Sequence, residues 1–208
     1  MTSYLDETRL AYDTVAVDYA SQLADSVASD PFDRATLGLF AELVGTDGPV
    51  LEVGSGPGRI AGHLSSLGLD VSGVDLSPRM VEVARSAYPS LRFDVGTMTA
   101  LDRPDASLAG LVAWFSIIHL PPDVLPVVFA EFRRVVAPGG HVVFAFQVGD
   151  ERVRITQAYG HTVDVDAYRL SPDRIVALLS DAGFTLRWRT FRAQEPPAKT
   201  PAAYLIVH

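Results

Sequence analysis

The chain has 208 residues and no cysteine, 48% of its residues are hydrophobic and 20% are charged, and its formal net charge is −8. This length and composition predict one soluble globular domain with a sizeable core and leave room for a small cap. The net charge argues against a nucleic-acid partner, and the lack of cysteine excludes disulfides, thiolate metal ligands and a cysteine nucleophile.

The amino-terminal part of the sequence predicts helices and no targeting segment. Residues 1–19 carry acidic side chains early and no apolar run. We therefore expect neither a signal peptide nor a membrane span, and the expected location is the cytoplasm. Apolar residues near helical spacing predict a helix over residues 5–26. The stretch Ser29-Asp30-Pro31 is typical of a helix start, because proline is favoured in the first turn, and predicts a second helix over residues 32–44.

Strands and helices alternate at short spacing from residue 50 onward, which is the pattern of a sheet whose strands are connected by helices. Residues 147–170 interrupt this alternation, because they are polar and irregular in pattern, and loops of such length usually carry function. The predicted strands are residues 50–53, 71–75, 91–95, 108–115, 141–146, 184–191 and 203–207, and the predicted helices are 59–67, 78–87, 122–136 and 172–182.

The composition of the strands indicates how the sheet is covered. The strands at residues 50–53 and 108–115 are almost wholly apolar, which is typical of parallel strands with helices on both faces. The last two strands have no helix between them, so we expect them to pair antiparallel. The predicted fold of residues 46–208 is therefore α/β, with a doubly wound, mostly parallel seven-stranded sheet, an antiparallel terminal strand hairpin and helices on both faces.

A glycine-rich turn, Gly54-Ser55-Gly56-Pro57-Gly58, follows the first strand, where a doubly wound sheet binds its ligand. Asp75 ends the second strand, where a carboxylate accepts hydrogen bonds from ribose hydroxyls. The dinucleotide pattern needs a third glycine where this chain has Arg59. Glu52 would repel a pyrophosphate and attract a positive charge. A nucleoside with an amino-acid tail suits both carboxylates, and S-adenosylmethionine is such a ligand.

These motifs, together with Asp75-Leu76-Ser77 and the terminal hairpin, resemble the class I S-adenosylmethionine-dependent methyltransferases over residues 40–208. The resemblance implies a Rossmann-like domain, S-adenosylmethionine as methyl donor and a small molecule as acceptor. It implies that Leu76 and Met80 flank the adenine, and that Thr97 stands where the family usually has an acidic residue. The cofactor-binding residues that it implies are Tyr12, Glu52, Gly54, Ser55, Gly56, Gly58, Asp75, Leu76, Met80, Thr97, Met98, Phe115 and Ser116.

Two residues are candidates for the chemistry, which needs alignment and, for a protonated nucleophile, a base. His119 follows the fourth strand at the rim that faces the expected methyl group, and an imidazole can take a proton near neutral pH. A core or capping histidine is the alternative interpretation. Tyr12 and Tyr19 share one helix face, and in relatives such a helix folds over the cofactor. This makes Tyr19 the second catalytic candidate, with simple packing as its alternative.

The same resemblance suggests which segments surround the acceptor. Residues 1–45 are expected to form helices that act as a lid over cofactor and substrate. Residues 147–170 are expected to cover the substrate, with Tyr159 and His161 as candidate contacts or, alternatively, as parts of a solvated loop.

The leading functional hypothesis is methyl transfer from S-adenosylmethionine to a small-molecule acceptor, and the compact size suits a secondary metabolite. Transfer to oxygen is preferred because His119 then has a role as base, while nitrogen, sulfur and carbon acceptors stay open. The five histidines are scattered and the chain has no asparagine, so no metal is expected. The alternatives are an NAD(P)-dependent oxidoreductase and a non-catalytic S-adenosylmethionine-binding protein. No nucleic-acid or membrane partner is expected, and the protein is expected to be a monomer or a homodimer.

Overall fold

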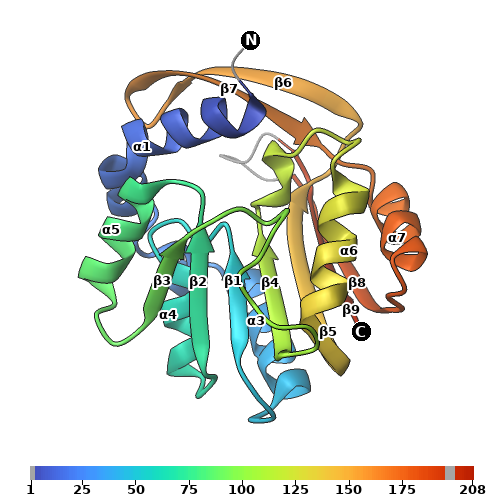
Figure 1. Ribbon diagram of the computed structural model, residues 1–208. Helices are drawn as coiled ribbons and strands as arrows, with labels where there is room; N and C mark the ends of the chain where they lie inside the picture. Colours follow the sequence, from blue (N-terminus) through green and yellow to red (C-terminus); the bar gives the residue numbers. More distant parts are fainter. Residues whose placement is uncertain (1–2, 195–199) are drawn as a thin grey trace.

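The computed structural model describes residues 3–194 and 200–208, and its centre is a seven-stranded sheet (Figure 1). Strand β1 pairs in parallel with β2 and β4, β2 with β3, and β4 with β5, whereas β9 is antiparallel to both β5 and β8. The predicted fold class is confirmed, including the terminal hairpin, whose connection runs through residues 195–199 outside the described residues. In order across the sheet, the strands are β3 (Arg92–Val95), β2 (Val71–Asp75), β1 (Val50–Val53), β4 (Leu108–Trp114), β5 (Val136–Gln147), β9 (Ala202–Val207) and β8 (Leu186–Arg192).

Helices cover both faces of the sheet because the strand side chains alternate between two apolar cores. Leu51 and Val53 of β1 belong to one core, with the helices α6 (Leu125–Val135) and α7 (Pro172–Asp181). Val50 belongs to the other core, with α3 (Pro31–Val44), α4 (Arg59–Ser66) and α5 (Pro78–Ala87). The period of two along a strand therefore places Glu52 on the α3–α4 face, beside Val50. None of the described helices is both long and apolar enough to cross a membrane.

The amino-terminal helix is shorter than predicted. Helix α1 (Tyr4–Gln22) ends four residues early, and a separate turn of helix, α2 (Ser26–Ser29), follows it. The Ser26 hydroxyl donates to the carbonyl of Leu23 at 2.8 Å. Such local side-chain bonds compete with continued helix, which accounts for the break.

Residues 147–170 form regular structure, so the prediction of an irregular segment was wrong. Strands β6 (Glu151–Ala158) and β7 (His161–Arg169) pair antiparallel in a separate two-stranded sheet. Tyr159 and Gly160 connect them with φ angles of 52° and 85°. Two successive positive φ values match the type I′ turn of a tight hairpin. Figure 1 shows this hairpin arching over α1, above the end of the sheet where the parallel strands finish.

Helix α1 and the β6–β7 hairpin together form a cover over that end of the sheet. A small apolar cluster joins α1, α5 and β7, and ion pairs join the edges of the cover: Arg154 to Glu7 at 2.8 Å and His161 to Asp18 at 2.7 Å. Asp13 of α1 accepts hydrogen bonds from the Ser77 hydroxyl at 2.6 Å and from the Arg79 N–H at 3.2 Å. This carboxylate lies at the amino-terminal end of α5, where the helix dipole favours a negative charge.

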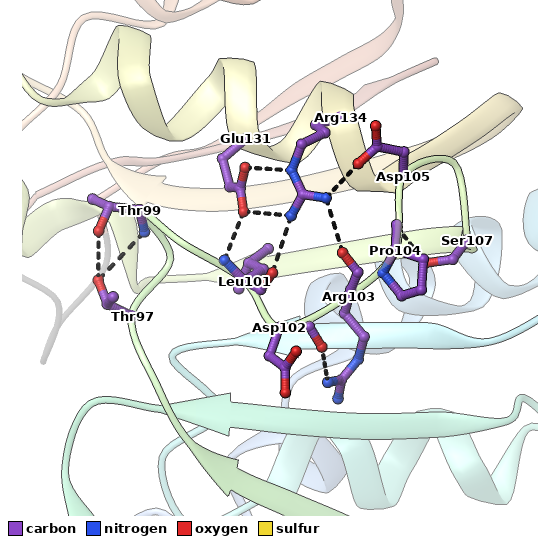
Figure 2. Close-up of polar contacts among 10 residues, drawn as sticks. All are labelled: Thr97, Thr99, Leu101, Asp102, Arg103, Pro104, Asp105, Ser107, Glu131 and Arg134. Atoms are coloured by element: carbon purple, nitrogen blue, oxygen red, sulfur yellow. Dashed lines mark hydrogen bonds and ion pairs between the residues drawn. The ribbon is translucent and has the colours of Figure 1, made fainter.

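The connection between β3 and β4 is held against α6 by Arg134 (Figure 2). The guanidinium of Arg134 donates to both carboxylate oxygens of Glu131 at 2.7 Å and to the backbone carbonyls of Arg103 and Leu101 at 2.9 and 3.0 Å. Glu131 also accepts the N–H of Leu101 at 2.6 Å. One charged group therefore binds this connection at several points between Leu101 and Asp105.

Candidate functional site

Two adjoining cavities lie at the carboxyl ends of the parallel strands, beneath the cover. The strand-end cavity is bounded by the glycine turn, the ends of β2 and β4, and α1. The hairpin cavity, of about 610 Å³, lies between α1, the β6–β7 hairpin and the ends of β5 and β9. This volume is within the range of small-molecule sites. Four residues line both cavities, and together they are named the shared wall: Tyr12, Tyr19, Phe115 and His119.

The backbone of the glycine turn borders the strand-end cavity because Gly54 and Gly56 carry no side chain. Gly54 and Gly56 both line this cavity and have φ angles of 68° and 52°. A Cβ atom at Gly54 would lie only 2.4 Å from the Cβ of Ser116. The backbone at this point therefore requires glycine, for its left-handed conformation and for its close approach to β4.

Asp75 connects the glycine turn to the start of α5. Its carboxylate accepts the N–H of Gly56 at 2.7 Å and the N–H of Ser77 at 2.8 Å, and it lines the strand-end cavity. Burial raises the pKa of Asp75 to about 6, although these backbone N–H donors oppose the shift. Asp75 therefore stays ionised at neutral pH and retains lone pairs for a further donor.

Glu52 faces away from both cavities, toward the first turn of α4. Its side chain is buried, and its carboxylate accepts the N–H of Ala61 at 2.9 Å. Burial raises the pKa of Glu52 to about 8, against the opposing effect of Arg59. Its proposed contact with an ammonium group remains a prediction. Ser55, Gly58 and Met80, which the sequence also suggests for cofactor binding, likewise do not line the strand-end cavity.

The opposite side of the strand-end cavity comes from β4 and from the loop after β3. Thr97 and Met98 line it, and the Thr97 hydroxyl is 2.9 Å from that of Thr99 (Figure 2). Leu76 and Ser116 line it as well. The hydroxyl of Ser116 and the indole N–H of Trp114 are buried without a hydrogen-bond partner among the described residues. Each of these polar groups can form one further hydrogen bond, to water or to a ligand.

The shared wall contains a strained residue, which indicates that its position is functionally constrained. Phe115 follows β4 with a φ of 51°, in a region that non-glycine residues seldom adopt. This conformation costs on the order of 1–3 kcal/mol and occurs most often at functional sites. It carries Phe115 to the border between the two cavities.

His119 is held in one tautomer by the cover. Its Nδ1 lies 2.8 Å from the backbone carbonyl oxygen of Asp166 in β7, so Nδ1 carries the proton. Its Nε2 is then an acceptor, and the hydroxyl of Tyr12 donates to it at 2.7 Å. Burial lowers the pKa of His119 and raises that of Tyr12 well above its ordinary value, so both groups are neutral near pH 7. The structure thus brings together two residues that lie 107 positions apart.

Aromatic rings extend from Tyr12 into the hairpin cavity. The rings of Tyr12 and Tyr19 have centroids 6.0 Å apart, and those of Tyr19 and Tyr159 are 4.9 Å apart. Tyr159 lines the hairpin cavity, whereas His161 pairs with Asp18 outside it. Sequence reasoning missed Arg59, which also lines this cavity, and it missed the α1 residues Tyr4, Leu5, Thr8 and Arg9 of the strand-end cavity. In the part of the chain that the structure describes, no cluster of three or more metal-ligating side chains occurs.

Comparisons with known proteins place this architecture among methyltransferases. A methyltransferase domain family matches residues 50–140. The chain is 31% identical over 120 residues to an uncharacterized methyltransferase of Mycobacterium tuberculosis, a match that covers 56% of this chain and 47% of the relative. It is 29% identical over 161 residues to an O-methyltransferase of Penicillium expansum, covering 73% and 58%. The chain therefore spans about half the length of the curated relatives it matches.

A solved structure shows the same fold over the whole chain. It is a Burkholderia thailandensis 1,6-didemethyltoxoflavin N1-methyltransferase with bound 1,6-didemethyltoxoflavin and S-adenosylhomocysteine. The TM-score is 0.72, the match covers 100% of this chain and 91% of the other, and the sequence identity is 18%. At this identity the likeness concerns the fold.

Proposed function

We propose that the chain is a class I S-adenosylmethionine-dependent methyltransferase that transfers a methyl group to a small molecule in the hairpin cavity. A methyltransferase domain family matches residues 50–140. The observation that carries this proposal is the shared wall, through which a donor site and an acceptor site meet. Bound S-adenosylmethionine supplies an electrophilic methyl carbon on its sulfonium sulfur. Holding the acceptor beside that carbon is the main task of the protein.

The residues of the strand-end cavity suit this cofactor. Asp75 would accept hydrogen bonds from ribose hydroxyls, and Leu76, Thr97 and Met98 would surround the adenine. The unpaired Ser116 hydroxyl and Trp114 N–H are available to polar groups of the cofactor. Helix α1 would cover it, in keeping with the expected role of residues 1–45 as a lid.

Transfer to an acceptor oxygen is the reaction that best uses the pair of Tyr12 and His119. The neutral imidazole has a lone pair on Nε2, and the Tyr12 hydroxyl already donates to it. An acceptor hydroxyl beside Tyr12 would give its proton to the phenol oxygen as the phenol proton passes to Nε2. His119 then becomes an imidazolium whose Nδ1–H stays bound to the Asp166 carbonyl. The similarity to an O-methyltransferase of Penicillium expansum supports this preference.

Two measurements test the proposed function. Calorimetric titration with S-adenosylhomocysteine and with NAD(H) should give binding of the first alone, and binding of NAD(H) alone would favour an oxidoreductase instead. Incubation with methyl-labelled S-adenosylmethionine and a panel of phenols, alcohols, carboxylates and amines should yield a labelled product. Tight cofactor binding without product from any acceptor class would favour a non-catalytic binding protein.

A further inference from the structure

The charged groups of the hairpin cavity contrast with the charge of the chain as a whole. The formal net charge is −8, with 25 acidic and 17 basic residues. Among the described residues, however, the lining includes three arginines and no aspartate or glutamate: Arg59, Arg169 and Arg192. Within an acidic protein, this cavity therefore presents a cationic interior.

The three arginines differ in how far their charge is already compensated. Arg169 pairs with Glu151, and Arg192 pairs with Asp30. The Nη1 atom of Arg59 is buried and has no hydrogen-bond partner among the described residues. A guanidinium cannot lose its charge near neutral pH, so a buried N–H of this kind needs an acceptor.

Two buried carboxyl groups, those of Glu52 and Asp33, interact electrostatically with Arg59. Burial raises the pKa of each, that of Glu52 to about 8. An anion that enters the hairpin cavity would meet a guanidinium that lines the cavity and whose Nη1 has no hydrogen-bond partner among the described residues.

The rest of the lining is apolar and aromatic. Tyr19 and Tyr159 line the cavity with ring centroids 4.9 Å apart, and the charge of Arg59 acts on the Tyr159 hydroxyl. Val153, Val163 and Val165 contribute aliphatic surface from the hairpin. Such a lining suits a flat or apolar molecular body, while one charged group sets the orientation.

Resting on the proposed methyl transfer, we infer that the acceptor is an aromatic or apolar molecule with an anionic group, held by Arg59 through charge-assisted hydrogen bonds. A carboxylate and a phosphate share the chemistry that a guanidinium fork recognises. With its anionic end at Arg59 and its ring against Tyr19, such a molecule would extend toward Tyr12 and His119. Arg59 is then a specificity-determining residue, although it begins α4 directly after the glycine turn.

The test measures binding of small probes to protein saturated with S-adenosylhomocysteine. Benzoate and phenyl phosphate are the anionic probes, and benzamide and benzyl alcohol are their neutral counterparts. Calorimetry should show that at least one anion binds about tenfold more tightly than its neutral counterpart, and the tighter anion identifies the preferred group. Arg59→Gln should reduce this ratio to near one, and Arg59→Lys, which keeps the charge, should keep part of it.

The control is Arg79→Gln, which removes the same charge from an exposed arginine paired with Glu82 outside both cavities. This variant should preserve the anion preference. Equal binding of anionic and neutral probes by the unaltered protein would overturn the inference, as would a preference that survives Arg59→Gln. Loss of S-adenosylhomocysteine binding in Arg59→Gln with unchanged probe ratios would show that Arg59 serves the cofactor instead. Failure of the unaltered protein to bind S-adenosylhomocysteine would instead count against the proposed function itself.

Discussion

The strand-end cavity and the hairpin cavity meet at one wall, but they are held together in different ways. Around the strand-end cavity, the glycine turn is fixed by Asp75, and the loop after β3 is fixed by Arg134. Above the hairpin cavity, the cover rests on a small apolar cluster and on ion pairs at its exposed edges. The first contacts join side chains to backbone groups of the main sheet and its connections, whereas the hairpin is a separate two-stranded sheet. The strand-end cavity is therefore built into the main sheet, and the hairpin cavity is closed by an attachment to it.

The largest expected effect concerns the wall that both cavities share. His119→Ala removes the proton acceptor, and we expect kcat to fall by about 10²–10⁴-fold, the usual range for a general base. Affinity for S-adenosylhomocysteine should change much less than kcat, because the glycine turn and Asp75 are unaltered, although His119 also lines the strand-end cavity. Steady-state kinetics and calorimetry measure the two quantities. Tyr12→Phe, which keeps the ring and removes the hydroxyl, is the matched variant, and wild-type kcat in both variants would contradict the proton path.

A second prediction concerns the affinity for the cofactor alone. Asp75→Ala removes a carboxylate acceptor, and each lost hydrogen bond to a charged group should weaken cofactor binding by about 1.5–3 kcal/mol. Calorimetry with S-adenosylhomocysteine checks this. The unchanged binding of an acceptor-site probe is the control that separates the two cavities. An unaltered cofactor affinity would remove Asp75 from the ribose site.

The pH dependence of cofactor binding also tests the role of the Asp75 carboxylate. Because burial raises the pKa of Asp75 to about 6, its carboxylate is ionised at pH 7 and becomes protonated as the pH falls through 6. Cofactor affinity should therefore decrease by up to about tenfold for each pH unit below 6, since one proton competes with binding. Asp75→Asn should lack this dependence. A flat profile in the unaltered protein would contradict the role of the carboxylate.

Glu52→Gln tests how the sheet tolerates a buried acid beside the glycine turn. The folded pKa of about 8 lies above the ordinary value of 4.5, so burial favours the protonated form. The stability that this proton provides is complete below pH 4.5 and is lost as the pH rises through 8. The variant should gain stability relative to the unaltered protein across this window, by up to about 1.4 kcal/mol per pH unit. Urea unfolding at several pH values measures the difference, and a constant difference would contradict it.

The same variant tests the predicted ammonium contact. A contact between Glu52 and the ammonium group predicts that Glu52→Gln weakens binding of S-adenosylmethionine more than binding of adenosine. The difference should appear as the pH rises through about 8, where the Glu52 carboxyl group ionises. Equal losses for the two ligands, measured by calorimetry, would leave Glu52 with the structural role that its bond to Ala61 already shows.

The smallest expected effect concerns the edge of the cover. Asp18→Asn removes the exposed partner of His161, and such pairs contribute at most about 1 kcal/mol to stability. Thermal unfolding should therefore change only slightly. A large loss of stability would show that the cover is more firmly integrated with the sheet than its contacts suggest.

The glycine turn and the strand ends beside the strand-end cavity could be predicted from the sequence because these segments are short and local. The glycine turn follows its strand directly, and Asp75 ends the next strand along the chain. Periodicity alone could also have placed Glu52 with Val50, on the face that α4 covers. The end of α1 at residue 22 depends on the hydrogen bond from the Ser26 hydroxyl to the Leu23 carbonyl, which the hydrophobic pattern of the sequence does not reveal.

The hairpin cavity was less predictable because its parts come from distant regions of the chain. The alternating valines and isoleucine of the hairpin stand among many charged residues, which hid the strand period in residues 151–169. In the sequence, Arg59 stands out only because it occupies the position of the third glycine of the dinucleotide pattern. Its place in a cavity depends on a hairpin tip that lies 100 residues later, at Tyr159.

The two ends of the hairpin come together at one point of the sheet. Leu170 donates its N–H to the carbonyl of Gln147 at 2.9 Å and accepts the N–H of Gly149 at 3.2 Å. The segment between Gln147 and Leu170 therefore leaves the main sheet and returns to it at one position. A hairpin anchored in this way is an exchangeable module. Evolution or an engineer could lengthen, shorten or replace it to admit a different acceptor, while the register of β5 and the strand-end cavity stay as they are.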